Sequence, residues 1–231
     1  MLVKDAIEFG KISNGNTKMP GTTFSIDAFA CQTGSKLAKI KGTSCNSCYA
    51  RKLQKLRPSV DIGYKLNLAK YNKALSEDKL FTWVSAMVFQ IERQAKKTNV
   101  YYHRWFDAGD LQSEQMFKAI CLVCERTPNI KHWLPTQERK YINVYAIPKN
   151  LCVRISGTKV NGKPNYLRNF QSDYGFYNKS FSFDNICTST VHTKDHEPIG
   201  KECKAYTREN NCGTCRACWD TTVKNVSYKK H

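Results

Sequence analysis

The chain has 231 residues, of which 37 are Lys or Arg and 19 are Asp or Glu, and its formal net charge is +18. A chain of this length that is 41% hydrophobic can bury a full core, and its 11 cysteines cannot all pair. No apolar run is long enough for a membrane span, and the first residues do not resemble a signal peptide. We therefore expect a cytoplasmic protein without membrane contact, whose clustered cysteines bind metals or serve redox chemistry.

The predicted elements alternate between strands and helices. In chain order they are a strand-like run at 24–30, helices at 49–56, 61–75 and 78–97, a strand at 100–107, a helix at 113–126, a strand at 130–135, a helix at 138–147, and strands at 151–156 and 181–186. This order predicts an α/β fold with a mostly parallel sheet, open or rolled into a partial (β/α) barrel. We expect residues 1–190 to form this domain and residues 191–231 to form a Cys-rich, metal-binding extension.

Functional residues of such a sheet gather at the carboxyl ends of its strands. On this topology one rim carries Cys31 after the first strand, Asp107 and Asp110 after the second, Thr136 after the third and Gly157 after the fourth. The two acids at the rim are candidates for catalysis or for orienting a substrate. A tight turn in which Arg104 neutralises one of the acids is the alternative.

Four cysteines near the end of the chain lie within sixteen residues: Cys203, Cys212, Cys215 and Cys218. Their segment is rich in Gly, Asn, Thr and Lys and has almost no apolar residues, so the thiols have no core to join. Four thiolates complete a zinc site or hold a 4Fe-4S cluster, and the tight C-x2-C-x2-C spacing is closer to that of bacterial ferredoxins. We call these residues the quartet, and expect an iron-sulfur cluster there, with zinc as the alternative.

Three further cysteines, which we call the trio, lie in a loop of small and polar residues after the first strand: Cys31, Cys45 and Cys48. Three thiolates can hold three irons of a cubane and leave the fourth iron open to a substrate or cofactor. Two alternatives remain: Cys31 is unrelated to the other two, or one member of the quartet completes a single shared site.

The remaining cysteines fit a structural role better. Cys121 and Cys124 adjoin the apolar stripe of a predicted helix, and Cys152 lies in a short apolar strand. Buried cysteine behaves as a small hydrophobic residue, so we expect these three in the core. Cys187 ends a strand-like run, where a core position and a ligand position are equally compatible with the pattern.

Several motifs together resemble the bacteriophage "gene product 88" family. They are Thr-Thr-Phe-Ser at 22–25, the Cys-x-x-Cys-Tyr-Ala loop at 45–50, the run from Arg104 to Asp110, and the closing Cys-x-x-Cys-x-x-Cys-Trp at 212–219. The loop is also similar to the cluster loop of radical S-adenosylmethionine (SAM) enzymes, although a longer insertion separates Cys31 from Cys45.

This second resemblance implies a fold, a cofactor and a chemistry. Radical SAM enzymes are barrels in which three cysteines after the first strand bind a 4Fe-4S cluster, and a turn after the second strand holds the amino group of SAM. Ala108-Gly109-Asp110 would correspond to that turn, so Gly109 and Asp110 are candidate cofactor-binding residues. The resemblance implies reductive cleavage of SAM, and a reductant protein as a further partner.

Half of the net charge lies between residues 31 and 75, which hold ten Lys or Arg and one acid, Asp61. Such a basic field attracts phosphates and speeds encounter with nucleic acid, so we expect Arg51, Lys52, Lys55 and Arg57 to contact DNA or RNA. The interleaved Tyr49, Tyr64 and Tyr71 could stack on unpaired bases, as could the aromatic residues of the 166–183 segment. A solvated basic helix face is the alternative.

Two hypotheses of different classes follow. The first is a radical-SAM-like iron-sulfur enzyme that acts on nucleic acid in the host cytoplasm, with an auxiliary cluster at the quartet. The second is a non-catalytic protein in which iron-sulfur or zinc stabilises a surface that binds DNA or RNA.

Overall fold

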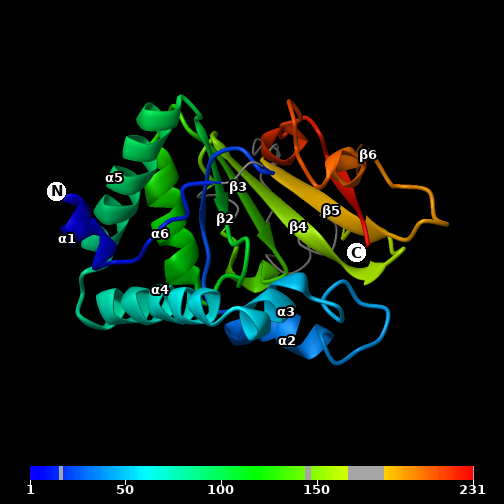
Figure 1. Ribbon diagram of the computed structural model, residues 1–231, viewed down its shortest axis with the longest axis horizontal. Helices are drawn as coiled ribbons and strands as arrows, with labels where there is room; N and C mark the ends of the chain where they lie inside the picture. The colour runs from blue at the N-terminus through cyan, green and yellow to red at the C-terminus, as the bar shows by residue number, and fades with distance from the viewer. Residues whose placement is uncertain (16–17, 144–146, 166–184, 231) are drawn as a thin grey trace.

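The computed structural model describes residues 1–15, 18–143, 147–165 and 185–230 (Figure 1). Its α-helices are α1 (Val3–Ile7), α2 (Gln32–Leu37), α3 (Tyr49–Leu56), α4 (Pro58–Ser76), α5 (Leu80–Thr98) and α6 (Glu114–Glu125). Its strands are β1 (Thr22–Phe24), β2 (Tyr102–Trp105), β3 (Lys131–Thr136), β4 (Leu151–Val160), β5 (Ile186–His192), β6 (Lys201–Cys203) and β7 (Asn225–Lys229). Short 3-10 turns are η1 (Ala28–Ala30), η2 (Arg139–Tyr141), η4 (Lys204–Arg208) and η5 (Ala217–Trp219).

The seven strands form one sheet in the order β1-β2-β3-β4-β5-β7-β6, and each neighbouring pair is parallel. The sheet curls into a half-barrel, as expected of a partial (β/α) barrel. Because all strands run the same way, their carboxyl ends lie along one rim, where the loops that follow β1, β2 and β3 meet.

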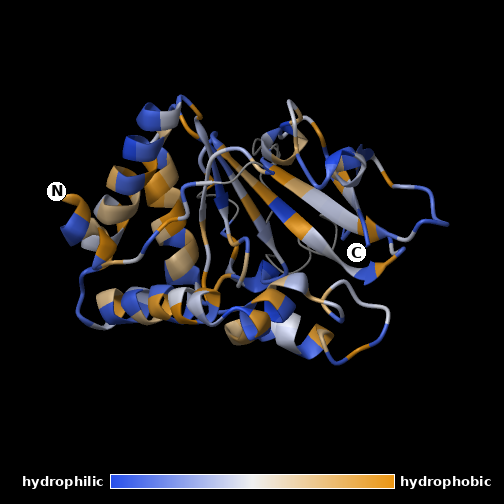
Figure 2. Cartoon of the chain, viewed as in Figure 1, coloured by the Kyte–Doolittle hydropathy of each residue, from blue (hydrophilic) through white to orange (hydrophobic). Residues whose placement is uncertain are grey.

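One face of the sheet packs against helices α5 and α6 and forms the main core. Phe24, Trp105, Leu134 and Val153 point to this side, and Trp83 of α5 packs edge-on against Phe24. Each of these side chains is at most 1% exposed, so each contributes about 1.5–3 kcal/mol by burial. Figure 2 shows the hydropathy pattern of the helices that cover this face, with hydrophobic and hydrophilic residues mixed along each of them.

The opposite face of the sheet is polar and aromatic, and the C-terminal extension covers it. Arg154 of β4 is fully buried and donates hydrogen bonds to the carbonyl oxygens of Ala217, Cys218, Asp220 and Thr188. Trp219 stacks edge-on against Tyr102 and Trp133, and its Nε1 donates to the His103 carbonyl. The extension is therefore fixed to the sheet through its backbone as well as through Trp219.

The predicted helices at 49–56, 61–75, 78–97 and 113–126 are confirmed as α3, α4, α5 and α6, and three predicted strands are confirmed as β2, β3 and β4. The helix predicted over 138–147 is wrong for the described part, which holds only the turn η2. There the Glu138 side chain bonds to Thr33 and its backbone N–H bonds to Thr136, so the chain crosses the rim instead of starting a helix. Residues 144–146 lie outside the described ranges.

Three further differences concern the end of the sheet. Gly157 lies inside β4 rather than after it, because the Thr43–Lys159 bridge and Ser44 hold the strand extended to Val160. The predicted strand at 181–186 lies mostly outside the described residues, and β5 begins at Ile186. The extension supplies β6 and β7 to the same sheet, two short strands that its polar sequence did not reveal.

None of the helices in the described ranges is both long and apolar enough to cross a membrane.

Candidate functional site

The trio lies on the rim, in the loop that follows β1. Cys31 immediately precedes α2, Cys48 immediately precedes α3, and Cys45 lies in the turn between the two helices. Gly34 of α2 faces two of the thiols: a Cβ atom added to it would lie 3.8 Å from Cys31 Sγ and 3.7 Å from Cys45 Sγ. The structure therefore brings Cys31 and Cys45 to one gap, which the absence of a side chain at Gly34 keeps open.

Hydrogen bonds fix this loop to the ends of β3 and β4. Ser44 N–H donates to the Thr158 carbonyl over 2.9 Å, and Ser44 Oγ donates to the Gly157 carbonyl over 2.8 Å. On the other side of the loop, the fully buried Glu138 carboxylate accepts from both the backbone N–H and the hydroxyl of Thr33. The protein's own polar groups thus position the trio.

Electrostatics link the three thiols to one another. Burial raises the pKa of Cys31 far above its usual value, and Asp110, Cys48 and Cys45 raise it further. Burial also raises the pKa of Cys45 to about 11, with a smaller contribution from Cys48, whereas Arg51 lowers both values. Thiols in such surroundings stay protonated unless a metal cation replaces their protons.

The candidate residues Gly109 and Asp110 form a tight turn at the same rim. Gly109 has φ +86°, and a Cβ there would collide with Ile26. Asp110 Oδ1 accepts from Thr136 Oγ1 and from Leu111 N–H, and Oδ2 accepts from Gln137 N–H. Burial raises the pKa of Asp110 to about 7. This acid therefore joins the loop after β2 to the end of β3.

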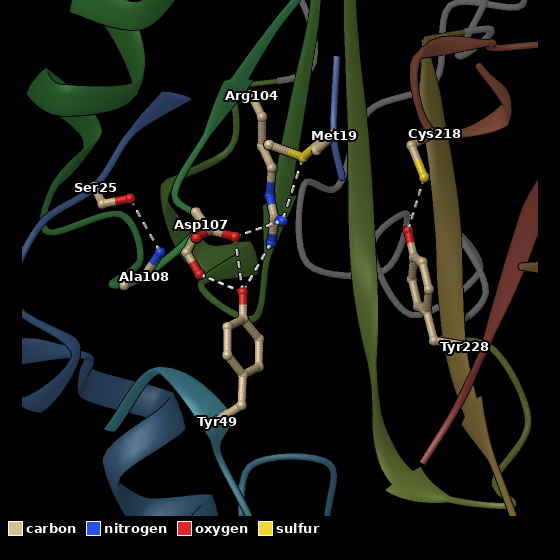
Figure 3. A network of polar contacts seen from close by, with 8 residues as sticks. All are labelled: Met19, Ser25, Tyr49, Arg104, Asp107, Ala108, Cys218 and Tyr228. Atoms are coloured by element: carbon tan, nitrogen blue, oxygen red, sulfur yellow. Dashed lines mark hydrogen bonds and ion pairs between the residues drawn. The ribbon is translucent and has the colours of Figure 1, made fainter. Parts of the chain in front are cut away.

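Asp107 is the more open of the two candidate acids. Its Oδ1 pairs with Arg104 over 2.6 Å, as the alternative interpretation of the turn anticipated, and accepts from the Tyr49 hydroxyl over 2.8 Å. Its Oδ2 accepts no hydrogen bond from any residue that the structure describes. Figure 3 shows Asp107, Arg104 and Tyr49 as one network. Because Tyr49 follows Cys48 directly, this network adjoins the trio.

The quartet lies on the face of the sheet that the extension covers. Cys203 raises the pKa of both Cys212 and Cys218, and Cys215 raises that of Cys212, after burial as the largest cause in each case. Cys203 therefore lies near both Cys212 and Cys218, and Cys215 lies near Cys212. Cys218 Sγ lies 3.1 Å from the Tyr228 hydroxyl, a contact drawn in Figure 3.

The two cysteine groups lie on either side of Arg104. Its guanidinium stacks on Trp133 at 4.5 Å and lowers the pKa of Cys212 and Cys218, while its carboxylate partner Asp107 is bonded to Tyr49 beside the trio. Within the described ranges, no three His, Cys, Asp or Glu side chains converge as ligands of a single metal ion.

The other four cysteines are buried. Cys121 and Cys124 belong to the main core, and Cys152 is 1% exposed, which confirms the structural interpretation of all three. Cys187 is also buried, and its Sγ donates to the Thr221 carbonyl over 3.5 Å. A hydrogen bond between Cys152 and Cys187 raises the pKa of the former and lowers that of the latter.

The predicted nucleic-acid-binding residues differ in their exposure and in their contacts within the protein. Lys52, Lys55 and Arg57 are exposed along α3 and before α4. Arg51 is committed to the protein, because it donates to the Ala28 carbonyl and to Ser35 Oγ and stacks on Phe29. The aromatic segment at 166–183 lies outside the described residues. The basic surface defined by Lys52, Lys55 and Arg57 therefore lies beside the trio loop.

The sequence did not reveal three residues that shape these sites, Gly34, Glu138 and Arg154. It named Tyr49 as a stacking residue but not as a partner of Asp107. Tyr49 has a visible signal, since it directly follows Cys48, and Glu138 follows the predicted rim residue Thr136. Gly34 and Arg154 carry no such signal, because their roles depend on loops distant in sequence.

Comparison with protein families gives a match to the model described as Gene product 88 over residues 4–221. No curated protein and no solved structure matches the chain.

Proposed function

The chain belongs to the gene product 88 family. From the arrangement of its cysteines we propose that it is an iron-sulfur protein whose trio holds a 4Fe-4S cluster at the rim of the half-barrel. The observation that carries the proposal is the meeting of Cys31 and Cys45 around the gap at Gly34, with Cys48 electrostatically coupled to both.

The residues around the trio fit such a cluster. A cubane takes one thiolate at each iron corner, so its ligands surround it instead of converging on one point. Three thiols leave one corner without a cysteine. Bound, the cluster would supply one-electron chemistry at an iron with an open position. Arg51, which lowers the pKa of Cys31 and Cys45, favours thiolates there.

We propose that the quartet holds the second cluster, with zinc as the alternative metal. Four cysteines saturate either centre, so this site would store electrons or stabilise the extension rather than bind substrate. Arg104 beside Cys212 and Cys218 would offset the negative charge of the thiolates. The trio and quartet would then be two sites, not one shared site.

The proposed activity is radical-SAM-like chemistry on nucleic acid in the host cytoplasm, supported by a reductant protein. SAM would take the open corner of the trio. Asp110 already accepts from three protein donors, so we assign it the positioning of the rim, together with Gly109. Asp107 keeps one carboxylate oxygen for a ligand, and is the acid that we expect to contact substrate.

One experiment tests the cluster. Anaerobically purified protein should contain iron and sulfide, and electron paramagnetic resonance of the reduced protein should change when SAM is added. The variant Gly34→Leu keeps every thiol but fills the gap between Cys31 and Cys45, and should lose the SAM-sensitive signal. Ser47→Leu, at an exposed position of the same loop, is the matched control. Iron that survives in Gly34→Leu with an unchanged signal would refute the assignment.

A second candidate function is a non-catalytic DNA- or RNA-binding protein with structural metal. The exposed basic surface favours it. Zinc alone at the quartet, and no iron at the trio, would favour it. In either case the double variant Lys52→Glu/Lys55→Glu should weaken nucleic-acid binding and lower its salt dependence, whereas Lys96→Glu/Lys97→Glu on α5 should not.

A further inference from the structure

A cavity of about 400 Å³ lies between the N-terminal segment, the end of β1 and the first turns of α4. The lining residues of α4 recur every three or four positions, so one face of this helix forms a wall of the cavity. Its lining includes Met19, Leu53, Val60, Gly63, Tyr64 and Asp107. This volume falls within the range of small-molecule sites.

The cavity adjoins the trio through two side chains. Tyr64 lines the cavity and packs in a small cluster with Cys48 and Ala108. Asp107 also lines the cavity, and its carboxylate accepts a hydrogen bond from the hydroxyl of Tyr49, the residue after Cys48. A molecule held in the cavity would therefore lie one side chain away from the proposed cluster.

The walls combine apolar surface with polar groups, among them the Asp107 carboxylate. Met19, Leu53, Val60 and the Tyr64 ring offer a surface suited to a flat, aromatic molecule. Asp107 Oδ2, which accepts from none of the described residues, can accept a hydrogen bond from a donor on that molecule. Carboxylates accept from exocyclic amino groups of bases, as Asp and Glu do from cytosine N4.

The positive charge beside the cavity indicates that the ligand also carries negative charge. Leu53 and Val60 at the wall flank the exposed Lys55 and Arg57, and Lys11 lines the cavity. A polyanion lying on this basic surface would place its bases next to the opening.

We infer that the cavity binds an unpaired nucleobase that carries an exocyclic amino group, with its phosphate backbone on the basic surface. This inference rests on the nucleic-acid part of the proposed function and names its substrate: adenine, cytosine or guanine, rather than uracil or thymine. Enzymes that act on a base take it out of the stack into such a pocket. The base could come from a single strand or from a free nucleotide.

The variant Gly63→Met tests the cavity. A Cβ on Gly63 would meet nothing within 4 Å, and φ at this position is not left-handed, so the longer side chain enters the cavity without straining α4. Ala69→Met, at an exposed position of the same helix, is the control. Binding of fluorescent single-stranded oligo(dC) and oligo(dT) to the full chain, purified anaerobically, gives the readout.

We expect the protein to bind oligo(dC) about tenfold more tightly than oligo(dT), and Gly63→Met to abolish this difference while Ala69→Met preserves it. Competition by dCMP at comparable affinity would assign the site to free nucleotides. A requirement for the strand would assign it to nucleic acid. Equal affinity for both strands, or a Gly63→Met variant that binds as the parent does, would overturn the inference.

These outcomes are separable from failure of the proposed function. If Gly63→Met has no effect but Lys52→Glu/Lys55→Glu still weakens binding, nucleic acid remains the partner and only the cavity assignment falls. If no strand binds the parent protein, the partner assignment and the inference fall together, whereas the iron content of the trio is measured independently.

Discussion

The trio and the quartet are both groups of cysteines in polar loops, but the protein holds them in opposite ways. The trio is positioned by side chains at the strand ends, among them Glu138 and Gln137. The quartet is held by its backbone, whose carbonyl oxygens at 217, 218 and 220 bond to the buried Arg154. The loop of the trio is suited to a site that exchanges ligands. The docked segment of the quartet is suited to a metal site that keeps its ligands permanently.

The largest expected effect is on the docking of the quartet. Arg154→Met removes the buried guanidinium that donates to four carbonyl oxygens, of which those of Ala217 and Asp220 keep a backbone donor, so we expect the free energy of unfolding to fall by about 4 kcal/mol. Urea unfolding measures it, with the exposed Lys131→Met on β3 as control. Hydrogen exchange should speed up over 203–220 and remain slow over 31–37. Equal acceleration in both segments would break the comparison.

The converse variant acts on the trio. Glu138→Ala removes the carboxylate that accepts two hydrogen bonds from Thr33, so α2 should be loosened at a cost of about 3 kcal/mol. The bonds of Gln32 to Gln112 and Tyr141 remain. Hydrogen exchange over 31–37 should rise while that over 203–220 stays unchanged. Glu125→Ala, exposed on α6, serves as the control. A protected α2 in Glu138→Ala would show that other contacts position the trio.

Acid should loosen the sheet that carries both groups. Burial lowers the pKa of His132 in β3 from its ordinary 6.5 to about 3. As the pH falls, the His132 imidazole is protonated in the unfolded chain before it is protonated in the folded protein. Its contribution to the free energy of unfolding is therefore complete above pH 6.5 and is lost as the pH falls toward 3. Between pH 7 and pH 5 the free energy of unfolding of the parent should therefore fall by about 2 kcal/mol more than that of His132→Gln. Parallel pH profiles for the two proteins would exclude this cause.

The smallest effect sharpens the account of the quartet. Trp219→Phe keeps an aromatic ring against Tyr102 and Trp133 but loses the Nε1 hydrogen bond to the His103 carbonyl. We expect a loss of about 1 kcal/mol in thermal or urea unfolding. Tyr206→Phe, which removes an exposed hydrogen bond in the same segment, should have no measurable effect. A larger loss in Tyr206→Phe would mean that the turn η4 anchors the extension.

Much of the helical framework could be predicted because its signals are local. The apolar stripe of α5 and the Ser113 cap of α6 lie within single stretches of sequence, and both helices form where these signals place them. The helix expected after Glu138 failed because a tertiary contact, from Glu138 to Thr33, competes with local helix formation. β7 was missed because its short, polar sequence carries no strand pattern, and its pairing with β5 and β6 is a tertiary contact.

The candidate site divides in the same way. Cysteine spacing by itself predicted the trio and the quartet and separated them from the core positions Cys121, Cys124 and Cys152, because ligand spacing and apolar periodicity are properties of the chain. Tertiary structure alone decided that Gly34 opens the gap between Cys31 and Cys45, that Asp110 is occupied by β3 while Asp107 stays open, and that Arg104 lies between the groups. These facts depend on loops brought together by a parallel sheet, whose contacts join residues far apart in sequence.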